Sequence, residues 1–376
     1  MIPVNAPLLG DEELARVTEA LRSGQISSVG PCVEEFEERW AAYCGRRHAV
    51  AVANGTVALQ LAVACLDLEP GDEVVIPAFT IISCALAVLY AGGVPKLVDA
   101  DPRTWTMDPD AVARAVGPRT RAIMPVHIYG HPVDLDPILT LAEGRGLAVV
   151  EDAAEAHGAE YRTRRAGGEA WRRCGSFGAM SCFSFYANKL VTTGEGGMVL
   201  TDDARLAERA RRLRNLAFEP GRRFRHSELG FNFRLTSLQA ALALPQIARM
   251  DAIVARKRWI AARFTAGLRG LPGLQLPAEE SWARSVYWMY GVVVDPDTGL
   301  DAATVGQRLA AREIETRPFF LGLHEMPALE RRGLFAGERH PTAERLARQG
   351  LYLPSGLGLT TEQIDQVVDA VRETLR

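Results

Sequence analysis

Between residue 48 and about residue 240, short and continuous apolar runs alternate with segments of helical periodicity. The apolar runs include HAVAVAN, EVVIPA, PKLVDA, RAIMPVH, LAVVED, MSCFSFY and GGMVLTD. Segments with a helical pattern lie between them, at 55–68, 80–92, 108–116 and 133–146. Strands that are apolar throughout are typical of parallel sheets covered by helices on both faces. We therefore expect an α/β fold with a mostly parallel sheet.

The C-terminal third has a different pattern. A helix is predicted over 237–268, with Pro245 as a possible kink. A strand-like run follows at 285–295, and helical patterns lie near 301–312 and 360–375. A chain of 376 residues exceeds the roughly 250–300 residues that one core supports. We expect a large domain over 1–245 and a smaller α+β domain over 246–376.

Composition and targeting signals narrow the possible functions. A net charge of -3 does not favour binding to nucleic acid or to an acidic membrane. The N-terminus lacks the pattern of a signal peptide, and no apolar run reaches about 18 residues. The six cysteines form no CxxC pair, which favours reduced thiols in the cytoplasm. No metal site is expected.

Three positions that follow predicted strands could together bind one ligand, because ligands of such sheets bind beyond the carboxyl ends of the strands. Gly55 and Thr56 begin a helix directly after a strand, where free N–H groups and the helix dipole favour a phosphate. A simple glycine turn with a threonine cap is the alternative for this tripeptide. Neither GxGxxG after a strand nor GxxxxGK occurs, so the usual nucleotide loops are missing.

The other two positions are a carboxylate and an amine. Asp152 follows Glu151 at the end of an apolar strand and should have a partner, either a helix N-terminus, an arginine or a protonated ring nitrogen. Lys189 lies five residues after Ser184 and is one of only three lysines among 43 basic residues. Arginine cannot replace a lysine that must act as a free amine. A phosphate site, a buried carboxylate and an amine are the groups that pyridoxal 5'-phosphate requires.

Long motifs then identify a family. The chain resembles the pyridoxal-phosphate-dependent sugar aminotransferases of the DegT/DnrJ/EryC1/StrS family in NGTVALQLA, PGDEVVIPAFT, VVEDAAEAHGAEY, SFGAMSCFSFYANKLVTTGEGGMVLTDD, LGFNFRLTSLQAAL and LPSGLGLTTEQI. The resemblance runs from about residue 3 to the C-terminus. It implies the aspartate-aminotransferase fold (fold type I) with a seven-stranded sheet, and a homodimer with shared active sites. It also implies amino transfer from L-glutamate to a nucleotide-linked keto-sugar.

The resemblance also implies roles for individual residues. Lys189 falls on the Schiff-base lysine, and Asp152 falls on the partner of the pyridine nitrogen. The positions of the phosphate ligands are Gly55, Thr56, Ser184 and, from the neighbouring subunit, Asn232. Glu155 falls on the position facing the cofactor's phenolic oxygen, where a carboxylate must share a proton.

Some positions depart from the family or concern its substrates. Ile81 stands where many relatives place an aromatic against the cofactor ring. The segment 167–174 resembles a short insertion, for which an exposed loop is the simplest expectation. The stretch IETRPFFLGLHEMPAL is most similar to the branch of GDP-perosamine synthases, which aminate a GDP-linked 4-keto-6-deoxymannose. By that analogy the substrate-binding residues are Ser28, Phe319, Phe320 and His324.

Several alternatives remain open at this stage. An aromatic pair beside a proline is often part of the core instead of a pocket. The substrate could be a 3-keto sugar linked to dTDP or UDP, or a keto-inositol. A related deoxysugar dehydratase replaces the lysine with histidine, so Lys189 argues against that reaction. A non-catalytic binding protein of the same fold would leave the cofactor residues without a purpose.

Overall fold

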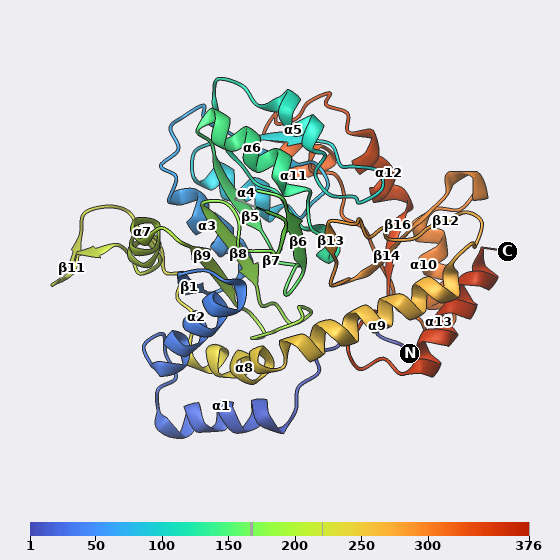
Figure 1. The fold of residues 1–376 in the computed structure, drawn as a ribbon, viewed down its shortest axis with the longest axis horizontal. Helices are drawn as coiled ribbons and strands as arrows, with labels where there is room; N and C mark the ends of the chain where they lie inside the picture. The colour runs from blue at the N-terminus through green and yellow to red at the C-terminus, as the bar shows by residue number, and fades with distance from the viewer. Residues whose placement is uncertain (166–167, 220, 376) are drawn as a thin grey trace.

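The central element of the fold is a seven-stranded sheet (Figure 1) in a computed structural model that describes residues 1–165, 168–219 and 221–375. The strands lie in the order β1 (His48–Val52), β9 (Gly197–Thr201), β8 (Met180–Ser184), β5 (Ala148–Asp152), β4 (Thr120–Ile123), β2 (Glu73–Pro77) and β3 (Val94–Val98). Strand β9 is antiparallel to both of its neighbours, and the remaining pairings are parallel. The expectation of a mostly parallel seven-stranded sheet is confirmed.

Helices cover both faces of this sheet, as continuous apolar strands predict. On β2, Val74 and Ile76 join the core that contains α3 (Gly55–Ala64) and α4 (Ser83–Tyr90). The intervening Val75 joins a second core with α5 (Pro109–Ala115) and α6 (Leu135–Arg145). Successive side chains of a strand point to opposite faces, so one apolar run supplies both cores. Three more helices, α1 (Asp11–Ser23), α2 (Pro31–Cys44) and α7 (Ala204–Arg214), lie around the β1 and β9 side of the molecule (Figure 1).

The C-terminal part has an antiparallel sheet and an apolar cluster of its own. Its strands lie in the order β12 (Leu274–Gln275), β14 (Tyr290–Val294), β16 (Gly350–Leu353) and β15 (Arg317–Pro318). The cluster is completed by α9 (Met250–Leu268), α10 (Ala302–Ala310) and α13 (Thr361–Thr374). Two shorter helices, α11 (Pro327–Glu330) and α12 (Pro341–Gln349), lie between β15 and β16 in the chain. The division between residues 245 and 246 stays a prediction.

The helix expected over 237–268 is two helices. Helix α8 (Ser237–Ala248) ends at Arg249, where φ is -103° and ψ is 11°, and α9 begins at the next residue. Pro245 lies inside α8, and the break between the two helices comes four residues after it, at Arg249. The break allows α8 to pack against α1 and α2, while α9 continues toward the C-terminal sheet (Figure 1). The side chain of Arg249 is held at the break by Glu13 of α1, at 2.7 Å.

Two small sheets complete the fold. Strands β13 (Ala283–Arg284), β6 (Glu160–Thr163) and β7 (Ala170–Arg173) form an antiparallel sheet. The segment 167–174 was expected to be an exposed loop, but four of its eight residues, Ala170–Arg173, form β7; residue 167 lies outside the described residues. The hairpin of β10 (Phe218–Glu219) and β11 (Arg222–His226) projects from the body of the molecule (Figure 1). None of the helices in the described ranges has the length and apolar character needed to cross a membrane.

Candidate active site

A cavity of about 620 Å³ lies at the carboxyl ends of the central strands. Its walls come from the turn between β1 and α3, the turn between β2 and α4, and the chain that follows β5 and β8. The C-terminal part closes it with Trp288, Phe320 and Tyr352. Eight of the predicted site residues line this one cavity: Gly55, Thr56, Ile81, Asp152, Glu155, Ser184, Lys189 and Phe320.

One end of the cavity is formed by the N-terminus of α3. The first N–H groups of a helix have no partner within it. The side chain of Asn54 accepts the N–H of Val57 at 3.0 Å, which leaves the N–H groups of Gly55 and Thr56 for a ligand. A Cβ atom on Gly55 would lie 2.6 Å from Cβ of Ser184, so only glycine allows the helix end to approach that serine. This end of the cavity is suited to a phosphate group.

The carboxylate predicted at the end of β5 is buried at the cavity wall. Asp152 is 3% exposed, and its carboxylate accepts the N–H of Ala154 at 3.0 Å and the thiol of Cys84 at 3.4 Å. Burial raises the pKa of Asp152, and these two donors and Lys189 act against that rise. Burial also holds the pKa of the Cys84 thiol well above its ordinary value, so its proton stays on sulfur and is donated.

The amine of Lys189 lies beside the carboxylate of Glu155. Lys189 Nζ is 3.6 Å from Glu155 Oε1, and the other oxygen of Glu155 accepts the N–H of Tyr129 at 2.7 Å. Burial raises the pKa of Glu155 to about 7, although Lys189 opposes the rise. Burial lowers the pKa of Lys189 from its ordinary value, while Glu155 and Asp152 raise it. The Glu155 carboxyl group can therefore exchange its proton near neutral pH, beside an amine whose charged form is disfavoured by burial.

These groups fit pyridoxal phosphate. The N-terminus of α3 offers N–H donors to a phosphate, Asp152 offers a buried carboxylate to a protonated ring nitrogen, and Lys189 offers a primary amine to an aldehyde. The ring would lie between these groups, with Ile81 of the β2–α4 turn exposed to 45% at the cavity wall.

Four predicted residues do not line this cavity in the described chain: Ser28, Asn232, Phe319 and His324. Phe319 is 4% exposed and packs against Trp105, with ring centroids 5.3 Å apart. The ring of His324 lies 3.4 Å from Glu344 Oε1. Asn232 is exposed in the single chain, and Ser28 lies with the β10–β11 hairpin at a separate surface hollow.

Sequence reasoning missed several residues of the site. Trp288 and Tyr352 reach the cavity from the C-terminal part, and Cys84 reaches Asp152 from α4. Trp288 stands in a run of apolar and aromatic residues, SVYWMYGVVV, in which a core strand is the natural interpretation. No local pattern marks one aromatic of that run as a cavity residue.

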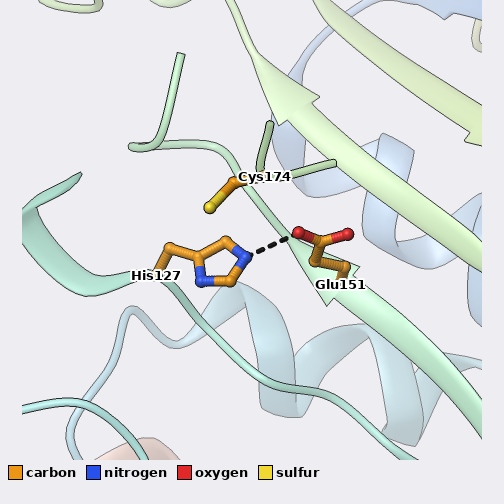
Figure 2. Close-up of side chains that lie close together, drawn as sticks. All are labelled: His127, Glu151 and Cys174. Atoms are coloured by element: carbon orange, nitrogen blue, oxygen red, sulfur yellow. Dashed lines mark hydrogen bonds and ion pairs between the residues drawn. The ribbon is translucent and has the colours of Figure 1, made fainter. Parts of the chain in front are cut away.

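A second polar cluster lies on the opposite side of β5. Glu151 precedes Asp152 and therefore points to the other face of the sheet, where it meets His127 and Cys174 (Figure 2). His127 Nδ1 accepts the N–H of Val133 at 3.0 Å, so the proton lies on Nε2, which donates to Glu151 at 2.7 Å. Glu151 also accepts the backbone N–H groups of residues 175 and 177. With both ring nitrogens in use, this cluster is a buried hydrogen-bond network and offers no free imidazole ligand to a metal.

Comparison with known proteins gives a consistent result. The model of the DegT/DnrJ/EryC1/StrS aminotransferase family matches residues 7–372. The chain is 41% identical over 375 residues to GDP-perosamine synthase of Caulobacter vibrioides, covering 100% of this chain and 98% of the relative. It is also 41% identical over 373 residues to dTDP-3-amino-3,4,6-trideoxy-alpha-D-glucose transaminase of Streptomyces venezuelae, covering 96% and 93% of the two chains. A crystal structure of S. venezuelae DesV in complex with a ketimine intermediate is similar with a TM-score of 0.88 and 38% identity, over 100% of this chain and 99% of the other.

Proposed function

The chain belongs to the DegT/DnrJ/EryC1/StrS aminotransferase family, and we propose that it moves the amino group of L-glutamate to a nucleotide-linked keto-deoxysugar with bound pyridoxal phosphate. One observation carries the proposal: the free N–H groups of α3, the buried Asp152 and the amine of Lys189 line a single cavity. These are the groups that anchor the phosphate, the ring nitrogen and the aldehyde of that cofactor.

Each residue of the cavity has a chemical task in this reaction. When bound, pyridoxal phosphate withdraws electrons from the carbon that loses its proton, and it carries the amino group between the two half-reactions. Lys189 Nζ would hold the aldehyde of the cofactor, and as a free amine it would serve as the general base for that proton. The Asp152 carboxylate would keep the ring nitrogen protonated, which would maintain the electron withdrawal.

Glu155 would control the proton next to Lys189. Its pKa near 7 allows the carboxyl group to hold a proton or release it around neutral pH. Gly55, Thr56 and Ser184 would hold the phosphate, and Ile81 would contribute an aliphatic side chain to the part of the wall that faces the cofactor. Membership of the aminotransferase family supports L-glutamate as the amino donor.

We propose that the active form is a homodimer. Asn232 is exposed in the single chain and would reach the phosphate in the neighbouring subunit. Ser28 would approach the partner's sugar nucleotide in the same way. Phe320 lines the cavity of its own chain, whereas Phe319 and His324 would support the sugar site from behind it. The six cysteines form no disulfide, which supports a reducing compartment such as the cytoplasm.

The substrate we favour is a GDP-linked 4-keto-6-deoxyhexose, as for the GDP-perosamine synthases. Relatives named for GDP-perosamine and for a dTDP-linked amino sugar are equally identical to this chain, at 41%. Overall similarity therefore does not choose the nucleotide, and the choice rests on the motif around Phe319 and Phe320.

A substrate panel tests the proposal. The purified protein with pyridoxal phosphate and ¹⁵N-labelled glutamate is given GDP-linked 4-keto, dTDP- and UDP-linked 3-keto and 4-keto sugars, and a keto-inositol. Mass spectrometry should find the heavy nitrogen in the GDP-linked 4-keto sugar, and Lys189→Arg should give no product. Labelling of another panel member would revise the substrate alone. A protein that takes no nitrogen from glutamate and labels no panel member would be a binding protein, and the proposal would fail.

A further inference from the structure

Two of the three lysines have no role in the proposed chemistry, and one of these two, Lys257, is buried. Lys96 forms an ion pair with Glu73 at 3.3 Å, and Lys189 is the reactive amine. Lys257 on α9 is 3% exposed, and no acidic side chain in the described ranges forms an ion pair with it. Burial lowers the pKa of Lys257 to about 7. A buried lysine without a counter-charge is costly, so its contacts should have a structural purpose.

The contacts of Lys257 lead to the active-site cavity. Its ammonium donates to the backbone carbonyl of Trp288 at 2.8 Å and to the carbonyl of Ser355. These carbonyls flank the C-terminal sheet, one before β14 and one after β16. Lys257 thus fixes the backbone from which the Trp288 side chain enters the cavity.

Trp288 contacts Lys189 in two ways. Lys189 Nζ lies 3.5 Å from the centroid of the indole ring, within the range of a cation–π interaction. The indole N–H donates to the carbonyl of Asn188, the residue directly before Lys189, at 2.7 Å. That carbonyl also accepts the side-chain N–H of Asn5 at 2.7 Å, so two donors fix the backbone beside the reactive lysine. Trp288 itself is 4% exposed and stacks on Tyr129 at 6.3 Å.

We propose that Trp288 is a positioning residue for Lys189, and that Lys257 acts through Trp288. The indole ring holds the Nζ atom at the cavity wall, its N–H fixes the backbone at Asn188, and Lys257 fixes the indole. The inference deepens the proposed function, since it assumes that Lys189 is the reactive amine.

The ring also affects the protonation of Lys189. The face of an indole attracts the ammonium form and not the neutral amine, so contact with Trp288 raises the pKa of Lys189. The charged or titratable side chains that face this amine are Glu155, Asp152 and His157. None of them changes when Trp288 is replaced. Loss of the ring face should lower the pKa of Lys189 by about one unit, since a desolvated cation–π contact is worth about 1–2 kcal/mol.

Amine labelling of the cofactor-free protein tests this inference without an activity assay. The protein is treated with acetic anhydride at a series of pH values, and the extent of labelling at each lysine is read by peptide mass spectrometry. Lys96 is the internal reference, because it lies far from the cavity on β3. In Trp288→Leu the labelling midpoint of Lys189 should fall by about one pH unit. In Trp288→Phe, which keeps an aromatic face, the fall should be smaller.

The matched control is Trp259→Leu, on the same helix as Lys257 but 40% exposed and away from the cavity. It should leave the midpoint of Lys189 unchanged. Lys257→Met keeps an unbranched side chain without the donors, and it should move the midpoint in the same direction as Trp288→Leu. If Lys257→Met does not fold, the two Trp288 variants decide the question.

The outcomes separate this inference from the proposed function. If the labelling midpoint of Lys189 in folded Trp288→Leu equals that in the wild type, the positioning role of Trp288 is refuted, while the substrate panel can still give product. If Lys257→Met folds and leaves the midpoint unchanged, its role through Trp288 is refuted. If Lys189 is not the residue that carries the cofactor, both the inference and the proposed function fail.

Discussion

Replacing Glu155 with glutamine should change the way in which stability depends on pH. The carboxyl group has an ordinary pKa of 4.5, and burial in the folded protein raises it to about 7. A carboxyl group whose pKa is raised on folding stabilises the folded state most at pH values below its pKa in the unfolded chain. That contribution is lost as the pH rises through about 7. The rise of the pKa from 4.5 to about 7 corresponds to about 3 kcal/mol in the free energy of unfolding, because one pKa unit is worth about 1.4 kcal/mol.

Urea unfolding of the cofactor-free protein at several pH values measures this effect. Between pH 4.5 and pH 8, the free energy of unfolding of the wild type should fall by about 3 kcal/mol relative to Glu155→Gln. The glutamine keeps an oxygen that can accept the N–H of Tyr129, so the comparison isolates the charge. The exposed Glu69 provides the control, since the free energy of unfolding of Glu69→Gln should depend on pH in the same way as that of the wild type. Parallel curves for Glu155→Gln and wild type would refute the pKa assigned to Glu155.

Further predictions concern the other groups of the cavity. Lys189→Arg should fold normally by circular dichroism and lose activity by about 100-fold or more, because a guanidinium cannot act as a free amine. Asp152→Asn should lower turnover to a similar degree at every pH, since an amide cannot keep the ring nitrogen protonated; turnover within a few-fold of the wild type would contradict its role. Gly55→Ala should lower the free energy of unfolding by about 1–3 kcal/mol and weaken cofactor binding, because its Cβ would lie 2.6 Å from Ser184; Gly144→Ala, in open space on α6, should cause no loss.

The site residues that follow the parallel strands were predictable from sequence. Ligands of such sheets bind beyond the strand ends, so Gly55, Asp152 and Lys189 had to converge if the fold was right. Their chemistry was also visible locally, because a lysine in an arginine-rich chain and an aspartate after an apolar strand are unusual. The fold itself was predictable because parallel strands buried on two faces leave a simple pattern of continuous apolar runs.

The parts that could not be predicted depend on contacts between distant segments. Trp288 lies 99 positions after Lys189 in the sequence, and the ring contact between them has no local signature. The break at Arg249 also has no local signature in the sequence, because it depends on packing against α1 and on the ion pair with Glu13. Phe319 and Phe320 are adjacent, yet only Phe320 lines the cavity, since backbone geometry decides which ring faces the core.

The location of the cofactor is the most direct test of the account. Reduction with borohydride makes the bond between the cofactor's aldehyde carbon and a lysine amine permanent, and this chain offers only three lysines. After incubation with pyridoxal phosphate, reduction and proteolysis, mass spectrometry should find the added mass on the peptide containing Lys189. Its appearance on Lys96 or Lys257, or on no lysine, would contradict the proposed active site.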